Sequence, residues 1–224
     1  MRIVKSMLLG AAILACVPTV AAAQERPWHF YFGGGPTFIA GGLGDRFSTG
    51  VGPAVGFTYD FNSRVGFGFE YAFRRFHAEN WLDTFGGSFT AYHDTNQLAF
   101  NIIFNITPAD SRARVYAIAG PGAYYRKATI TEYVGSGIIC DPYWYICGTY
   151  PITDIVGARG GWDFGFNVGA GVGFKLGSSE DAEFTIESRY HFVAGPEITP
   201  PAGSGLTGGK ANGYFIPLTF GFRF

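Results

Sequence analysis

The sequence is poor in charged residues and has no long apolar run beyond its amino-terminal segment. Only 15% of its 224 residues are charged, against about 25% in ordinary soluble domains, so its surface is depleted in charge. The formal net charge of −1 gives no support for nucleic-acid binding, which leaves a basic footprint. No apolar run of about 18 residues or more follows the amino-terminal segment, which argues against membrane-spanning helices.

The amino-terminal segment has the three parts of a secretory signal. Arg2 and Lys5 precede an apolar run over residues 7–17, and three alanines at 21–23 precede Gln24. This order predicts a signal peptide over residues 1–23 and a mature domain over residues 24–224. The residues around Cys16 partly resemble a lipoprotein signal, so lipidation of that cysteine is the alternative.

Aromatic residues and glycine are abundant, with 23 Phe, 13 Tyr and 34 Gly. Their arrangement is clearest in residues 213–224, where an apolar residue occupies every second position. A period of two predicts a β-strand with one apolar face. The stretch is long enough to cross a hydrocarbon core, which takes about 9–11 residues of a tilted strand. The apolar set is Tyr214, Ile216, Leu218, Phe220, Phe222 and Phe224.

Seven further stretches repeat this alternation, which predicts eight strands in all. They are residues 28–38, 51–61, 65–74, 97–106, 114–126, 162–175 and 183–192. In residues 114–126 either set could face outward, the one with Val115 and Ala117 or the one with Tyr116 and Ile118. That assignment stays open at this point.

Short and long connections alternate strictly between the predicted strands. The short ones, 60–64, 107–112 and 177–181, are rich in the residues of tight turns. The long ones are 39–50, 77–94, 127–161 and 194–212. Outer-membrane barrels have short periplasmic turns and longer external loops, so the alternation supports an eight-stranded antiparallel barrel. Such a barrel closes by pairing residues 28–38 with residues 214–224.

Packing decides which face points outward. Alternation alone also fits a soluble barrel of the lipocalin type, whose apolar face points inward. An eight-stranded barrel is only just wide enough for side chains to fill, and more than twenty aromatic residues would not fit inside it. We therefore expect the phenylalanine-rich face to contact lipid. Glycine on the other face leaves room for an Arg or a Tyr from across the lumen.

The inward set carries charges that we expect to pair with one another, because unpaired buried charge is costly. A structural network that fills the lumen is the default interpretation, and a small or gated passage is the alternative. The residues predicted for this network are Glu70, Arg74, Asp163, Lys175, Glu187, Arg189 and Arg223.

Residues 162–174, 183–192 and 213–224 resemble the eight-stranded outer-membrane β-barrel family that includes the OmpA transmembrane domain and the Opa-type surface proteins. The resemblance implies an all-β, transmembrane up-and-down barrel in the bacterial outer membrane, surrounded by outer-membrane lipids and lipopolysaccharide. It also implies a role in envelope integrity, adhesion or limited permeation. The terminal aromatic residues resemble the signal read by the barrel-assembly machinery, and they are Phe220, Phe222 and Phe224.

Two candidate features lie in the third long connection. Cys140 and Cys147 are the cysteines of the predicted mature chain, and in an oxidising envelope we predict a disulfide between them. A metal site is the alternative, but no histidine or second cysteine pair lies nearby. Between them Tyr143, Trp144 and Tyr145 form a candidate partner-binding loop for a host or surface ligand. The alternative is that these rings pack on the loop or rest among lipid headgroups.

The sequence predicts no enzymatic activity and no cofactor or metal site. Some eight-stranded barrels modify lipid A with a serine and a histidine near the lipid interface. Here the alternation places Ser188 toward lipid and His191 toward the lumen, so the pair is split. We therefore predict a structural or surface-interaction protein. The first alternative is a small diffusion channel, and the second is a lipid A-modifying enzyme.

Overall fold

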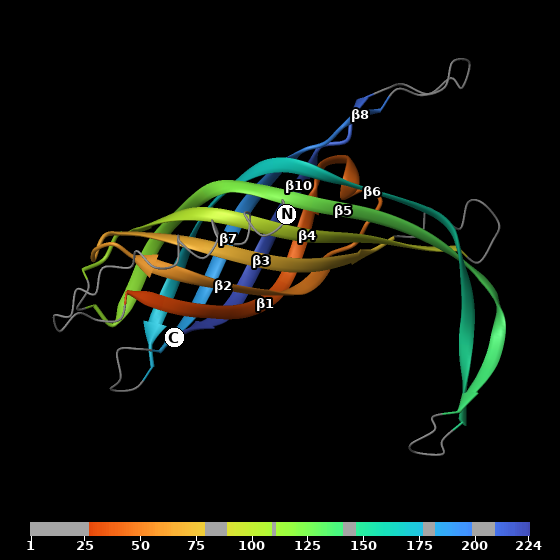
Figure 1. The fold of residues 1–224 in the computed structure, drawn as a ribbon, viewed down its shortest axis with the longest axis horizontal. Coiled ribbons are helices and arrows are strands. Elements are labelled where there is room, and N and C mark those ends of the chain that lie inside the picture. The colour runs from red at the N-terminus through yellow and green to blue at the C-terminus, as the bar shows by residue number, and fades with distance from the viewer. Residues whose placement is uncertain (1–26, 79–88, 109–110, 141–146, 177–181, 199–208) are drawn as a thin grey trace, which may run out of the picture.

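The fold is a closed ring of antiparallel strands, seen in a computed structural model that describes residues 27–78, 89–108, 111–140, 147–176, 182–198 and 209–224 (Figure 1). The ring contains β1 (Trp28–Ala40), β2 (Gly50–Asp60), β3 (Val65–His77), β4 (Phe89–Asn105), β5 (Ala113–Cys140), β6 (Cys147–Lys175), β7 (Glu183–Ala194) and β10 (Gly213–Arg223). These are the eight predicted strands. In the described part of the chain no helix is long and apolar enough to cross a membrane.

The first and last strands close the ring as predicted. β1 pairs antiparallel with β10, from Tyr31 opposite Arg223 to Ala40 opposite Tyr214. At one end Phe30 and Phe224 exchange two backbone hydrogen bonds, with N–O distances of 2.9 and 2.8 Å. Closure gives every described strand of the barrel wall a partner on each side, so the wall has no free edge strand.

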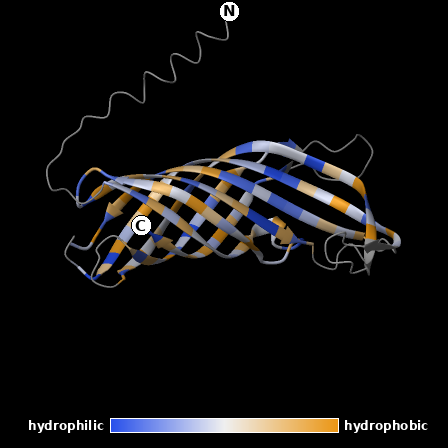
Figure 2. Ribbon diagram, turned by 60° about the horizontal axis from the view of Figure 1, so that its bottom comes forward, coloured by the Kyte–Doolittle hydropathy of each residue, from blue (hydrophilic) through white to orange (hydrophobic). Residues whose placement is uncertain are grey.

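The two faces of the wall follow the predicted alternation (Figure 2). Phe30 and Phe164 on the outer face are each 73% exposed, whereas Glu70 and Arg189 on the inner face are 6% and 5% exposed. The open assignment on β5 is also decided. Tyr116, Ile118 and Tyr124 are buried inside, and the alanines between them face outward, because only the inner position lets the Tyr116 hydroxyl reach Glu187.

Two of the predicted long loops are shorter than expected. The prediction for 77–94 was wrong at its second half, because β4 begins at Phe89. The prediction for 127–161 was wrong over most of its length, because β5 continues to Cys140 and β6 starts at Cys147. The connection over 194–212 also contains a small separate sheet of β8 (Glu197–Ile198) and β9 (Gly209–Lys210).

The extended part of β5 and β6 projects beyond the barrel as a hairpin that curves away from the barrel axis (Figure 1). β4 pairs with β5 as far as Glu132, and β7 pairs with β6 only from Phe164 onward. We call residues 133–140 and 147–163 the arm, since residues 133–140 pair only with β6 and residues 147–163 only with β5. Register shifts at Ile130/Thr131 and Tyr133/Gly135 mark β-bulges, which bend a strand.

The ends of the barrel differ. We call one end the turn end, because consecutive strands are joined there by the short connections over residues 61–64, 106–112 and 176–182. We call the opposite end, from which the arm projects, the arm end. At the arm end the segment between β1 and β2 contains the short helix η1 (Gly41–Leu43) and then Phe47, which forms a backbone bridge with Ala78. This segment therefore lies against the end of β3.

Glycines on the inner face accommodate aromatic rings, which come from the same or a neighbouring strand. Gly213 on β10 also accommodates the guanidinium of Arg126 from the non-neighbouring strand β5, as the prediction of an arginine from across the lumen requires. Gly171 on β6 pairs with Tyr116 on β5, and the tyrosine ring occupies the space that a Cβ at Gly171 would need. Gly122 accommodates the ring of Tyr124, two residues further along β5, in the same way. The ring lies over the glycine and the barrel stays narrow.

This packing predicts that Gly171→Val destabilises the barrel. The added side chain would displace the buried Tyr116 ring and its hydrogen bond, at a cost of about 1–3 kcal/mol. Denaturant unfolding of the protein in detergent micelles measures the change. Gly161→Val is the control, because nothing lies within 4 Å of a Cβ at that position. Equal stability of the two variants would contradict the packing argument.

Candidate functional site

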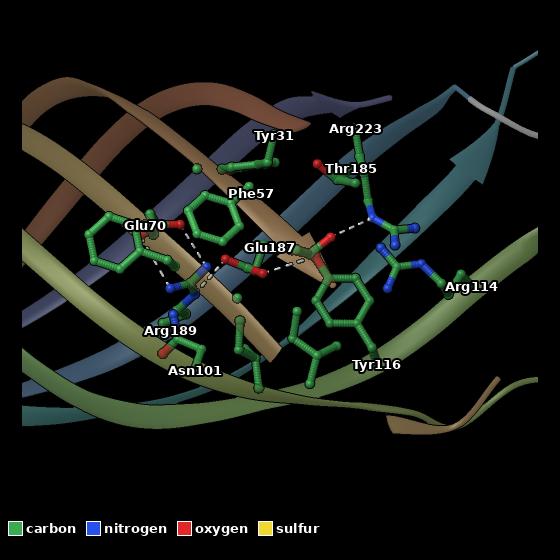
Figure 3. Close-up of a pocket in the computed structure, with 16 residues that line it drawn as sticks. Tyr31, Phe57, Glu70, Asn101, Arg114, Tyr116, Thr185, Glu187, Arg189 and Arg223 are labelled. Atoms are coloured by element: carbon green, nitrogen blue, oxygen red, sulfur yellow. Dashed lines mark hydrogen bonds and ion pairs between the residues drawn. The ribbon is translucent and has the colours of Figure 1, made fainter. Parts of the chain in front are cut away.

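The barrel interior is organised around Arg189. Its Nη2 lies 2.8 Å from Oε2 of Glu70, and its Nε lies 2.5 Å from Oε1 of Glu187, on the same strand. Figure 3 shows both carboxylates directed at the guanidinium. Tyr116 donates its hydroxyl to Glu187 at 2.9 Å, and Gln97 links Glu70 to Arg74 through its amide. This is the central cluster, which joins β3, β4, β5 and β7.

A second cluster lies nearer the turn end. Arg114 contacts Glu183 with an Nη2–Oε2 distance of 2.9 Å and donates to Asn105. Arg223 contacts the same glutamate at 3.3 Å and also pairs with Asp60. The sequence reasoning included Arg223 but missed Arg114, Asp60 and Glu183 as members. Arg114 lies on β5, whose inner and outer faces the sequence did not decide. Asp60 and Glu183 lie at the ends of their strands.

A third ion pair lies at the arm end, where Arg126 contacts Asp163 at 2.7 Å and donates to the carbonyl of Ala211. The seven residues predicted as one network are therefore divided along the barrel. Lys175 stands opposite Glu183 in the β6–β7 ladder, near the second cluster. Glu70, Arg74, Glu187, Arg189 and Arg223 are buried, but their partners depend on depth along the axis, which the alternation does not give.

An apolar layer crosses the interior between the central cluster and the arm end. Its buried members come from five strands and from the segment before β2. Phe76 and Phe215 stack with ring centroids 5.6 Å apart, and Phe47 lies 5.5 Å from the ring of His93. The buried residues of the layer are Phe47, Phe76, Ala91, Tyr124, Val193 and Phe215.

The sequence reasoning did not predict this layer, because it assigned aromatic residues to lipid. The alternation did indicate it, because Phe76 lies on the same face of β3 as Arg74. Phe215 likewise lies on the same face of β10 as Arg223.

A cavity lies between the central cluster and the cluster at the turn end. It offers about 40 Å³ to the centres of water-sized molecules, and one water needs about 10–15 Å³, so there is room for roughly three waters. The buried hydroxyls of Tyr31 and Thr185 line it and have no hydrogen-bond partner among the described residues. Figure 3 shows both side chains beside the central cluster. Side chains of both clusters line this volume.

Comparison with known proteins decides the family. A model of the outer membrane protein beta-barrel domain matches residues 8–224. The chain belongs to the outer membrane protein beta-barrel family. It is therefore an integral protein of the bacterial outer membrane, whose exposed aromatic face contacts lipid. The search of curated proteins found no match.

Solved structures share the fold at low sequence identity. A major outer membrane protein of Thermus thermophilus has a TM-score of 0.54 and 9% identity, covering 88% of this chain and 98% of the other. Neisserial surface protein A has a TM-score of 0.45 and 14% identity, with 88% and 96% covered. Ail, the attachment invasion locus protein of Yersinia pestis, has a TM-score of 0.46 and 14% identity, with 90% and 100% covered. At these identities the likeness concerns the fold alone.

In this family short turns face the periplasm and longer loops face outward, so the turn end is periplasmic and the arm is external. The candidate partner-binding residues Tyr143, Trp144 and Tyr145 lie outside the described residues, as does the predicted signal peptide. Phe220, Phe222 and Phe224 lie on the lipid face, exposed by 40%, 38% and 56%. Their role in assembly stays a prediction. Ser188 is exposed on the lipid face and His191 is buried inside, so the two are on opposite faces of β7.

We expect the charge clusters to stabilise the barrel through their burial. Arg189→Ala would leave Glu70 and Glu187 buried without their cation, at a cost of about 3–5 kcal/mol. Arg75 is the control, since it pairs with Asp94 at 2.7 Å but its side chain is 49% exposed. Arg75→Ala should cost about 0–1 kcal/mol. Unfolding free energies in lipid vesicles check the difference, and similar values for both variants would contradict it.

The predicted disulfide has a direct test. Cys140 and Cys147 are opposite partners in the β5–β6 ladder. Opposite residues in an antiparallel pair have Cα atoms about 4.5–5.5 Å apart, within the range of a disulfide. Mass spectrometry of the non-reduced, protease-digested protein should find the two peptides linked. Free thiols that react with an alkylating reagent before reduction would disprove the pairing.

Proposed function

We propose that this chain is a non-enzymatic structural and surface-interaction protein of the outer membrane, whose external arm contacts a host or surface ligand. The observation that carries the proposal is the length of the arm strands. β5 and β6 have 28 and 29 residues, whereas β1 and β10 have 13 and 11. The additional residues do not contribute to the membrane-spanning wall, so they serve a purpose outside it.

The arm has the properties of a contact surface. Among the described side chains of the arm, six large apolar ones are between 47% and 61% exposed: Tyr133, Val134, Ile152, Ile155, Val156 and Trp162. Among the described residues, β6 also has a free edge over residues 147–163, because β7 pairs with β6 only from Phe164 onward. Exposed apolar side chains and a free strand edge both support binding of another protein.

The lumen supports a closed barrel in preference to a diffusion channel. The central cluster and the apolar layer lie in series along the axis, and each is built from several strands. A channel would require the ion pairs of Arg189 and the packed rings of Phe47, Phe76 and Phe215 to move aside together. The charged lining of the cavity favours the channel alternative.

The positions of Ser188 and His191 on opposite faces of β7 support the non-enzymatic part of the proposal. A serine nucleophile needs its histidine within hydrogen-bond reach, and the barrel wall separates Ser188 from His191. His191 instead hydrogen-bonds to Tyr124 at 2.9 Å within the interior. Incubation with labelled lipopolysaccharide should leave its acyl composition unchanged.

The closed-lumen proposal predicts that the protein is silent in planar bilayers at every voltage. Phe76→Ala with Phe215→Ala would remove two stacked rings from the apolar layer and should produce current steps or leak. Phe30→Ala changes a lipid-facing ring and should stay silent. Regular single-channel steps from the unmodified protein would favour the channel alternative.

The interaction proposal predicts that a shortened arm abolishes adhesion and leaves the barrel intact. Deleting residues 133–153 and joining Glu132 to Asp154, which are partners in the ladder, through Asn-Gly would make a two-residue hairpin and keep the residues of β5 that pair with β4. Attachment of bacteria to host cells or matrix proteins is the measurement, with circular dichroism to confirm folding.

A second deletion separates the arm strands from the loop at their tip. Replacing residues 141–146 with Asn-Gly removes Tyr143, Trp144 and Tyr145 and keeps the strands. If bacteria still attach after the replacement of residues 141–146 but not after the longer deletion, the strands of the arm make the contact. If both deleted forms attach as well as the full chain, the proposed role of the arm is wrong.

A further inference from the structure

The cavity between the two charge clusters exists because short residues stand on the inner face of β2 and β3 at this depth. Gly56, Thr58 and Gly68 all line it, and Thr58 lies opposite Gly68 in the β2–β3 ladder. The charged side chains of the central cluster and of the turn-end cluster stand on either side along the axis. Because the three residues between them are short, the space stays open.

Two buried hydroxyl groups in the lining have no hydrogen-bond partner among the described residues. Thr185 is 1% exposed and lies on the inner face of β7, two residues from Glu183 and two residues from Glu187. It therefore stands between the two clusters. Tyr31 lies opposite Arg223 in the β1–β10 ladder, and Figure 3 shows it across the cavity from the central cluster. A buried hydroxyl without a partner is costly, so both groups point to an occupant of the cavity.

A third hydroxyl of the lining can also donate. Oγ1 of Thr58 accepts a hydrogen bond from Nε of Arg223 at 3.2 Å, which leaves the hydroxyl hydrogen of Thr58 to be donated. The hydroxyls of Tyr31, Thr58 and Thr185 come from three strands, β1, β2 and β7. Together they offer three O–H donors to whatever lies between them.

The charge of the lining favours an anion over a cation. Three guanidinium groups and two carboxylates line the cavity, which is a formal excess of one positive charge. They are Arg114, Arg189 and Arg223, with Glu70 and Glu187. Asp60 and Glu183, which pair with Arg223 and Arg114, are not part of the lining.

The two carboxylates of the lining are already engaged. Glu70 accepts hydrogen bonds from Arg189 and Gln97. Glu187 accepts hydrogen bonds from Arg189 and Tyr116. A cation in the cavity would have to compete with Arg189 for these oxygens, whereas the three hydroxyl hydrogens are directly available to an anion. Hydrogen bonds to an ion are about twice as strong as those between neutral groups.

Size and access narrow the choice to a small ion from the periplasm. The cavity has room for roughly three waters, and a halide ion is only slightly larger than a water molecule. Sulfate or phosphate would fill the cavity and add a second negative charge beside the carboxylates. Solvent reaches the turn-end cluster, because the side chains of Arg114 and Asp60 are 14% and 23% exposed.

We propose that the cavity binds one chloride ion, held by the hydroxyls of Tyr31, Thr58 and Thr185. The ion joins the central cluster to the turn-end cluster, so that the lumen is filled continuously up to the apolar layer. This site lies inside the barrel and is independent of the proposed role of the arm. Water alone is the other occupant that the volume admits, and the tests below separate the two.

Bromide locates the ion, because it replaces chloride and scatters X-rays anomalously. Crystals of the full chain grown from detergent in sodium bromide should show an anomalous peak within hydrogen-bond reach of the hydroxyls of Tyr31 and Thr185. Ordered waters in the cavity without such a peak would show that water alone fills it and would overturn the proposal.

Thr185→Val tests the contribution of the hydroxyl, because valine keeps the shape of the side chain. Thr37→Val is the matched control, since Thr37 is equally buried at 1% and does not line the cavity. Denaturant unfolding in micelles compares bromide with gluconate, which is too large for the cavity, at equal ionic strength. An ion that binds only the folded state stabilises it, so bromide should stabilise the unmodified chain and Thr37→Val.

The loss of one hydrogen bond to the ion should weaken the apparent affinity of Thr185→Val for bromide roughly tenfold. In gluconate this variant should be at least as stable as the unmodified chain, because it no longer buries an unpaired hydroxyl. Tyr31→Phe is a second variant with the same expected loss, should Thr185→Val fold poorly. Equal stability of the unmodified chain in bromide and gluconate would contradict the proposal, as would equal responses of Thr185→Val and Thr37→Val to bromide.

Discussion

A ring of eight strands is so narrow that its own side chains must fill the inside, and the whole molecule depends on this constraint. Arg189 is the central residue among the side chains that fill the lumen. It lies 5% exposed between Glu70 and Glu187, and its ion pair with Glu70 ties β7 to β3 across the lumen, while its pair with Glu187 lies within β7. Charge buried so deeply is tolerated only where its partners are complete. Gln97 donates to Glu70, Tyr116 donates to Glu187, and Arg74 donates to the side-chain oxygen of Gln97.

The filling changes character along the axis, and this order favours a closed barrel. The ion pairs of Arg114 and Arg223 lie near the periplasmic end, the central cluster follows, and the apolar layer lies toward the outside. A solute would meet charge, then hydrocarbon, within one narrow lumen. Phe47 adds a contribution from a loop, because the segment before β2 folds against the end of β3 and inserts the ring into the layer. The barrel is thus filled both by its wall and by one external connection.

The outside of the barrel has two features that differ from a plain wall. The arm extends β5 and β6 into the external space, where water can satisfy the free edge of β6 until a partner does. The groove at β10, β1 and β2 is an apolar depression of the lipid-facing wall, lined among others by Phe32, Gly34 and Phe220, and it lies beside two missing rungs of the β1–β10 ladder. Both features sit next to a gap in strand pairing. The arm is beyond the wall and the groove within it, so the surrounding medium, water or lipid, decides the kind of partner each can have.

The sequence by itself determined the number of strands, their faces and the closure of the ring. A period of two is a local property, and the packing limit of a narrow barrel then sets which face contacts lipid. It also placed Glu70, Arg189 and Arg223 inside, because their phase along each strand is enough for that.

Only the tertiary structure decided which inner residues meet. The contact between Arg114 and Glu183 joins residues 69 positions apart, and it depends on the register around the ring, which no single strand encodes. The arm escaped sequence reasoning for a related reason. Outside the membrane both faces of a strand meet water, so the alternation that reveals a wall strand fades while the backbone pairing continues to Cys140 and Cys147. The side-chain pattern of a strand reflects the medium that each of its faces contacts. Its pairing and register depend on the backbone of the neighbouring strands.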